Sequence, residues 1–195
     1  MNLENKIVLA SASPRRRELL SQIGINPRII PSQVEETITA HQPDEAVMEL
    51  SRQKAEDVAF SQKPGVLVIG ADTVVACQGK ILGKPKSHEE ACQMISMLQG
   101  RNHQVYTGVT LIYCGEKRKK TVTFAEKTEV FVSPMTQEEI WEYGWSSEPM
   151  DKAGAYGIQG RFKAFIERIE GDYNNVVGLP VCRVYHEIKK MMEEE

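Results

Sequence analysis

Apolar runs and helical periodicities alternate along the first part of the chain. Residues 7–10 and 66–69 are continuously apolar, which is typical of strands covered on both faces. Between them, periodic apolar positions predict helices over residues 14–23 and 43–60. Ser13 is the expected N-cap of the first helix. This order of elements predicts an α/β protein.

Turn and cap signals divide the middle of the chain. Gln78-Gly79 forms a two-residue turn after a strand that continues to Cys77, so we expect a hairpin. Capping-box patterns at 87–90 and 136–139 each predict the start of a helix.

Further β segments are expected at 103–114, 120–132 and about 163–169, before a last helix from Pro180. The inward positions predicted on that helix are Val181, Val184, Tyr185 and Ile188. Together these elements predict a mixed central β-sheet flanked by helices. We expect one domain over residues 1–195, in two lobes with a cleft.

Charge and composition restrict the function classes. The 195 residues contain 24 Lys and Arg against 27 Asp and Glu, a formal net charge of −3. Such a chain has no general field that attracts nucleic acid polymers or anionic lipid. No run approaches the roughly 20 apolar residues that cross a membrane. The four cysteines form no Cys-x-x-Cys pair, so we expect reduced thiols and a cytoplasmic location.

Three arginines, Arg15 to Arg17, fall in the first turn of the first predicted helix. The positive end of the helix dipole disfavours each cation there by about 0.3–1 kcal/mol. A strand followed by a helix N-terminus is also a natural phosphate site. The arginines therefore indicate a ligand with several phosphates, and the alternative is that they extend into solvent.

Asp72 interrupts an apolar run where a central strand is expected to leave the sheet. A buried carboxylate needs a metal, a cation or a ligand, unless it caps a turn. Lys54 lies near the apolar stripe of its helix, where it either extends out along its stem or reaches an anion. Glu35 and Glu36 could chelate a hard cation with Asp72, or simply remain solvated.

Two patterns follow the predicted hairpin turn. Lys84 is expected to face Thr73 across the hairpin. A bulge or twist would bring Lys84 to the Asp72 carboxylate. The alternative is that Lys84 is simply exposed. The loop 154–160 has Gly-x-x-Gly-x-x-Gly spacing, which permits close approach to a flat ligand, and Gln159 offers an amide to a base edge. With the phosphate and metal candidates, this loop predicts hydrolysis of a nucleotide phosphate.

Several segments in order resemble the signatures of the Maf family of nucleoside triphosphate pyrophosphatases. They are residues 11–16 (SASPRR), 70–75 (GADTVV), 83–85 (GKP), 103–109 (HQVYTGV), 151–160 (DKAGAYGIQG) and 175–180 (NVVGLP). The resemblance covers Ile7 to about Ile188. It implies a fold similar to that of the inosine triphosphatase group. The Gly-Ile-Gln-Gly sequence at 157–160 further resembles the subgroup that acts on dTTP and UTP.

The resemblance also implies roles for individual residues. These are Asp72 as proton acceptor; Glu36 and Asp72 as ligands of Mg²⁺ or Mn²⁺; Ser11, Arg15, Arg16, Lys54 and Lys84 as triphosphate-binding residues; and Arg15, Thr73 and Gln159 as determinants of base choice. The reaction implied is hydrolysis of a nucleoside triphosphate to monophosphate and pyrophosphate, by a homodimer. The alternative is a nucleotide-binding regulatory protein that acts on septum formation in cell division.

Overall fold

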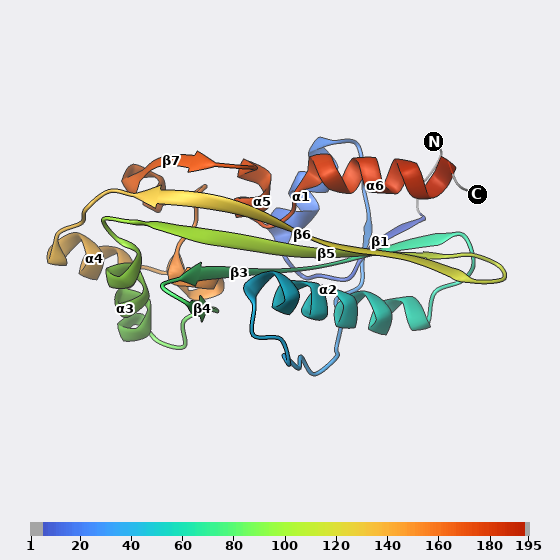
Figure 1. Cartoon of the computed structure of the whole chain (residues 1–195), viewed down its shortest axis with the longest axis horizontal. Helices are drawn as coiled ribbons and strands as arrows, with labels where there is room; N and C mark the ends of the chain where they lie inside the picture. The colour runs from blue at the N-terminus through green and yellow to red at the C-terminus, as the bar shows by residue number, and fades with distance from the viewer. Residues whose placement is uncertain (1–5, 194–195) are drawn as a thin grey trace. The chain divides into compact units, whose positions relative to one another are not determined.

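The computed structural model describes residues 6–193 and consists of two compact units that share one sheet (Figure 1). The first unit comprises Met1–Asp72, Thr107–Glu126 and Gly178–Glu195, and the second comprises Thr73–Tyr106 and Lys127–Val177. Within the described residues the sheet has seven strands in the order β2-β1-β3-β5-β6-β7, with β4 paired to β3. The predicted mixed α/β sheet with flanking helices is confirmed. The single domain predicted over 1–195 extends past the described residues at both ends.

The first unit is built on parallel strands. β1 (Ile7–Leu9) pairs in parallel with β2 (Arg28–Ile29) on one side and with β3 (Val66–Cys77) on the other. α1 (Pro14–Gln22) connects β1 to β2, and α2 (Pro43–Phe60) leads back to β3. The chain therefore leaves the carboxyl end of β1 where neighbouring connections diverge, which is where α/β sheets bind ligands.

Helix α2 packs directly on the backbone of the sheet. A Cβ atom at Gly70 would lie 2.3 Å from the Ser51 carbonyl oxygen, and one at Gly108 would lie 2.1 Å from that of Val47. Beneath the helix, Ala55, Val58 and Ala59 join a buried cluster with side chains of β1 and β3. Figure 1 shows α2 on one face of the strands and α6 (Val181–Glu193) on the other.

The second unit contains the predicted hairpin. β4 (Lys80–Leu82) pairs antiparallel with β3 through Cys77–Lys80, Ala76–Ile81 and Val75–Leu82. The turn residues Gln78 and Gly79 both have positive φ, 52° and 74°, as a type I′ turn requires. The predicted register is confirmed, but the paired strand ends at Leu82, before Lys84.

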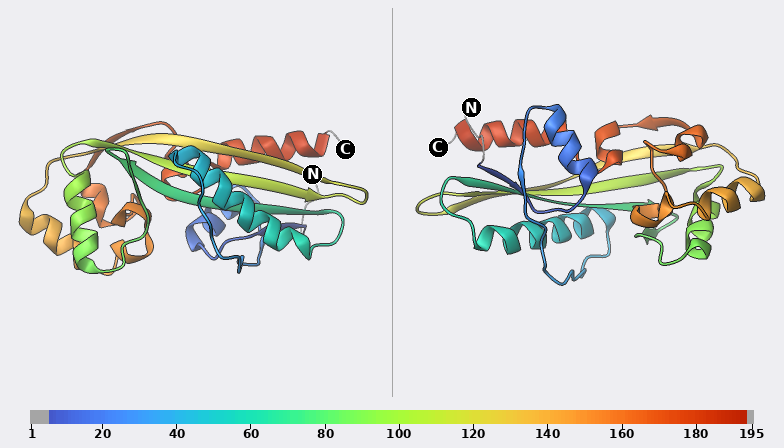
Figure 2. Two further views of the ribbon diagram at one scale, coloured as in Figure 1. Left: turned by 60° about the horizontal axis from the view of Figure 1, so that its bottom comes forward. Right: turned by 180° about the vertical axis from the view of Figure 1, so that it is seen from behind.

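Helices α3 (His88–Leu98) and α4 (Gln137–Gly144) lie side by side over the core of this unit (Figure 2). That core gathers side chains of α3, of α4 and of the strands around Phe162. The remaining elements are β5 (Asn102–Cys114), β6 (Lys119–Val132), β7 (Ile166–Glu170), α5 (Tyr173–Val177) and the 3-10 helices Pro149–Asp151, Ala153–Ala155 and Arg161–Phe165.

Some local predictions need correction. Ser13 occupies the N-cap position of α1 as predicted, although its side chain makes no capping bond. Helix α1 ends at Gln22, one residue before the predicted end. Tyr185 on α6 was predicted as an inward position and is 45% exposed. The strand expected from 163 begins at Ile166, because a 3-10 turn precedes it.

The two capping predictions differ in outcome. Thr136 and Glu139 form the full reciprocal box. At α3 the Ser87 side chain accepts from the Glu90 N–H, but the Glu90 carboxylate accepts from Lys86 instead. As expected, all four cysteines are free thiols, with Cys77 and Cys114 buried. Within residues 6–193 we find no helix whose length and apolarity would let it cross a membrane.

Candidate active site

Lys54 joins two carboxylates in the first unit. Its Nζ lies 2.5 Å from Asp72 Oδ1 and 2.9 Å from Glu36 Oε1. The Lys54 and Asp72 side chains are each 15% exposed, whereas Glu36 is 49% exposed. Of the two alternatives for Lys54, the side chain reaches anions, and those anions belong to the protein itself.

Contrary to expectation, β3 does not leave the sheet at Asp72, because it continues to Cys77 and pairs there with β4. On one edge, β3 pairs with β1 up to Ile69 and with β4 only from Val75. Asp72 lies in the interval between these pairings, just past the carboxyl end of β1. Asp72 therefore still lies where a ligand is expected, because ligands of α/β sheets bind at the carboxyl ends of strands.

Arg16 is buried in the first turn of α1 and donates hydrogen bonds to three neighbouring oxygens. Its Nη1 donates to the Ala71 carbonyl at 2.9 Å and to Ser11 Oγ at 3.0 Å, and its Nε donates to the Gly178 carbonyl at 2.9 Å. Burial lowers the pKa of the Arg16 guanidinium, while the Asp72 carboxylate opposes that shift. Arg16 therefore ties together the segments that surround Asp72.

The segment that carries Glu36 is fixed along α2 by one side chain per helical turn. Glu49 accepts from the Thr39 N–H, Gln53 exchanges two hydrogen bonds with the Thr37 backbone, and Asp57 accepts from Ser32 and Gln33. Figure 2 shows this segment as the loop beside α2. These bonds lower the pKa values of the Glu49 and Asp57 carboxyls. Glu36 thus faces Lys54 because its own loop is held to the helix of Lys54.

Three other predicted residues, Thr73, Lys84 and Gln159, belong to the second unit. The Gly154 N–H donates to the Gly83 carbonyl at 3.0 Å, which brings the glycine-rich loop beside Lys84. A Cβ at Gly154 would lie 2.7 Å from Val75, two residues after Thr73. Lys84 and Gln159 are exposed and Thr73 is half-buried. Asp72 and Thr73 are joined by a peptide bond, while Arg15 is a half-buried residue of α1 in the first unit.

Buried polar side chains hold the glycine-rich loop from beneath. Tyr156 is buried, and its hydroxyl lies 2.7 Å from His103 Nε2 on β5. Tyr143 donates to Glu148 at 2.9 Å, and the same carboxylate accepts from the Arg161 N–H at 2.9 Å. The sequence reading missed these contacts, because no local spacing relates residues so far apart in the chain.

The carboxylates of Glu36 and Asp72 fit a hard divalent cation. Both carboxylates bind the Lys54 ammonium, so they converge on one cationic group. No group of three or more His, Cys, Asp or Glu within residues 6–193 is arranged to hold a metal. Mg²⁺ is usually bound by one or two carboxylates with substrate phosphates and water. The pair thus suits a metal that a phosphorylated ligand helps to bind.

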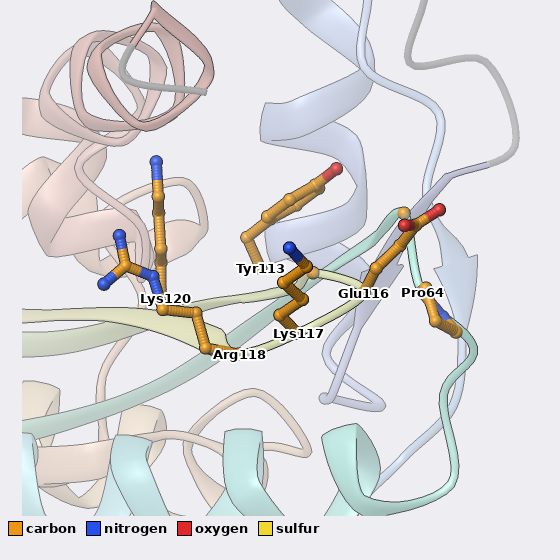
Figure 3. Close-up of a pocket in the computed structure, with 8 residues that line it drawn as sticks. Pro64, Tyr113, Glu116, Lys117, Arg118 and Lys120 are labelled. Carbon is orange, nitrogen blue, oxygen red and sulfur yellow. The ribbon is translucent and has the colours of Figure 1, made fainter.

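A separate open cavity of about 450 Å³ lies at the β5–β6 turn in the first unit (Figure 3). Its lining residues are Pro64, Gly65, Tyr113, Gly115, Glu116, Lys117, Arg118 and Lys120. None of the predicted site residues is among them. The cavity therefore is not the site that the sequence indicated.

Comparison with known proteins agrees with the resemblance. A family model described as Maf-like protein matches residues 6–191. The dTTP/UTP pyrophosphatase of Agathobacter rectalis is 52% identical over 96% of this chain and 98% of its own length. That of Carboxydothermus hydrogenoformans is 55% identical over 95% of this chain and 98% of its own. A solved HAM1 protein from Coxiella burnetii covers 98% of this chain and 100% of its own at 13% identity, with a TM-score of 0.48. On the family match and these identities, the chain belongs to the Maf-like protein family.

Proposed function

We propose that this protein hydrolyses dTTP and UTP, with related modified pyrimidine nucleotides, to the nucleoside monophosphate and pyrophosphate. One observation carries the proposal: relatives named dTTP/UTP pyrophosphatase share half or more of their residues with it over nearly the full length of both chains. The cluster of Lys54, Asp72 and Glu36 supports it, because it combines a cation for phosphate with carboxylates for a metal and a proton.

In the proposed reaction, water attacks the α-phosphorus, the bond from that phosphorus to the bridging oxygen breaks, and pyrophosphate leaves. Asp72 accepts the proton of the water. Asp72 and Glu36 would also be the residues that hold Mg²⁺ or Mn²⁺. When bound, such a metal neutralises phosphate charge and lowers the pKa of water.

The cationic side chains hold the triphosphate in this proposal. Lys54 and Lys84 act as point charges, and Arg15 offers a forked donor to phosphate oxygens. Arg16 and Ser11 contribute by keeping the turn after β1 in place, as their mutual hydrogen bond supports.

Base choice is assigned to Arg15, Thr73 and Gln159. The exposed Gln159 amide belongs to a loop whose glycines leave the backbone accessible, and Tyr156 fixes that loop from below. An amide both donates and accepts, which suits the edge of a pyrimidine. We further propose a cytoplasmic homodimer, and the four free thiols fit a reducing compartment.

The test is turnover of a panel of triphosphates by the purified protein, with and without Mg²⁺ or Mn²⁺, and identification of the phosphate product. We expect metal-dependent release of pyrophosphate, fastest from dTTP and UTP. Release of orthophosphate would refute attack at the α-phosphorus. Binding without any turnover would instead favour the regulatory nucleotide-binding protein.

Asp72→Asn in the same assay is expected to reduce kcat by at least about 10²-fold, the lower range for loss of a general base. Its circular dichroism and melting curve should remain those of a folded protein. Asp151→Asn, which removes an exposed carboxylate of the second unit, is the control and should retain activity. Full activity of Asp72→Asn would remove this residue from the chemistry.

A further inference from the structure

The ammonium group of Lys54 occupies the place between two carboxylates that a metal ion would take. Its Nζ is within hydrogen-bond distance of oxygens from both Asp72 and Glu36, at 2.5 and 2.9 Å. A Mg²⁺ ion bound to the same two oxygens would lie about 2.0–2.1 Å from each. The ammonium and the metal therefore cannot both sit between these oxygens.

The two carboxylate charges are already balanced by cations without a metal. Asp72 and Glu36 contribute two negative charges, while Lys54 and the buried Arg16 contribute two positive ones. A free divalent cation would have to displace Lys54 and leave its charge without a counter-ion in a mostly enclosed place. A triphosphate that brings its own metal still has net negative charge, so it supplies both the cation for the carboxylates and the anion for the lysine.

The side chains involved are able to exchange partners. Lys54 has a flexible four-carbon stem with rotatable donors and can follow a phosphate without any movement of α2. Glu36 is half-exposed, and besides its ion pair with Lys54 its loop is anchored to α2 by Gln53, the residue before Lys54. The carboxylates therefore keep their places when the lysine turns away.

We propose that Lys54 is an internal counter-ion that blocks the Glu36–Asp72 pair against free divalent metal until a triphosphate arrives and takes over the ammonium. Metal and nucleotide then bind together, and the empty site does not collect metal. This inference rests on the proposed function for the identity of the anion. Its central claim concerns metal binding in the absence of nucleotide.

The test is the affinity for Mn²⁺ without nucleotide, measured by the electron paramagnetic resonance signal of free Mn²⁺. Lys54→Met removes the charge and keeps the length of the stem. We expect it to bind Mn²⁺ at least about tenfold more tightly than the unmodified protein, because a nearby like charge is lost. Lys54→Arg keeps a cation and should bind as weakly as the unmodified protein.

Two controls identify the cause. Lys63→Met removes an exposed lysine just after α2 and should leave the Mn²⁺ affinity unchanged. Combining Lys54→Met with Asp72→Asn should abolish the gain, because the carboxylate that held the lysine is then missing. If Lys54→Met folds normally and binds Mn²⁺ no more tightly than the unmodified protein, the inference is wrong.

A second measurement separates this inference from the proposed function. A non-hydrolysable UTP analogue should tighten Mn²⁺ binding to the unmodified protein. The factor should be smaller in Lys54→Met, because that variant has no ammonium for the nucleotide to draw away from the carboxylates. An equal factor in both proteins would overturn the counter-ion role. Absence of hydrolysis of every triphosphate would refute the proposed function alone, since the Mn²⁺ titration without nucleotide does not depend on it.

Discussion

Arg16 shows how a charged side chain can serve the framework of a site. The residue is only 9% exposed, and its guanidinium links the Ala71 carbonyl, Ser11 Oγ and the Gly178 carbonyl. A lysine has the same charge but cannot present donors in this fork. Arg16 therefore positions Asp72 through the adjacent Ala71, whatever contact it also makes with phosphate.

Arg16→Lys is expected to lower the free energy of unfolding by about 2–4 kcal/mol, because buried carbonyls lose hydrogen bonds from a charged donor. Urea unfolding measures the effect. Arg17→Lys is the matched control, since Arg17 is the exposed next residue of α1, and it should change stability by less than about 0.5 kcal/mol. Equal midpoints for the two variants would contradict the role assigned to Arg16.

At the residue scale, the sequence indicated which charged side chains require a partner, but not which residues those partners are. Asp72 in an apolar run and Lys54 near an apolar stripe were both recognised as charges that require compensation. They compensate each other across 18 positions of sequence. No spacing rule predicts that contact, because it depends on how α2 lies against β3.

Among the elements, α2 comes closest to the sheet at two glycines, Gly70 and Gly108. Gly108 on β5 leaves no room for a methyl group, since its Cβ would meet the carbonyl carbon and oxygen of Val47 at 2.3 and 2.1 Å. Backbone atoms cannot move aside as a flexible side chain can. The position of α2, and of Lys54 on it, depends on this close approach.

Gly108→Ala is therefore expected to destabilise the protein by about 1–3 kcal/mol, as overpacking does. A lower melting temperature in calorimetry would show it. Gly83→Ala is the control, because a Cβ there has no atom within 4 Å and the backbone is not in the left-handed region. If Gly108→Ala were as stable as the control, α2 would be able to shift away from the sheet without loss of stability.

Elements set by local chemistry were predicted well, and those set by packing were not. The hairpin register followed from the Gln78-Gly79 turn alone, and α2 has the predicted bounds. The expectation that β3 leaves the sheet at Asp72 failed, because the strand changes its neighbour there and does not end. Tyr185 fits the apolar stripe of α6 by spacing, but the sheet beneath that helix does not cover it.

At the scale of the whole molecule, the second unit has a buried titratable group that makes stability depend on pH. Burial lowers the pKa of His103 to about 4, with Glu129 opposing the shift. Its Nε2 is bound to Tyr156, and its Nδ1 has no hydrogen-bond partner among residues 6–193. Between about pH 4 and the ordinary value of 6.5 the unfolded chain binds a proton that the folded protein does not, so the protein loses stability as pH falls.

The loss from pH 7 to pH 4 is expected to approach about 3 kcal/mol for this group. Urea unfolding of the unmodified protein and of His103→Gln across that range tests it, and the variant should have the shallower pH dependence. His186→Gln changes an exposed residue of α6 and should keep the steeper pH dependence of the unmodified protein. Parallel curves for the unmodified protein and His103→Gln would show that His103 does not cause the acid sensitivity.

The division of the chain into two units limits how the protein can be taken apart. The backbone passes from one unit to the other after Asp72, Tyr106, Glu126 and Val177. Neither unit is a continuous stretch, so no terminal truncation yields one of them intact, and a gene fragment would encode parts of both. Two residues assigned to different tasks, Asp72 and Thr73, flank the first of these passages. A recombinant exchange of the second unit between relatives would therefore have to graft two separate pieces of chain, with one junction directly after Asp72.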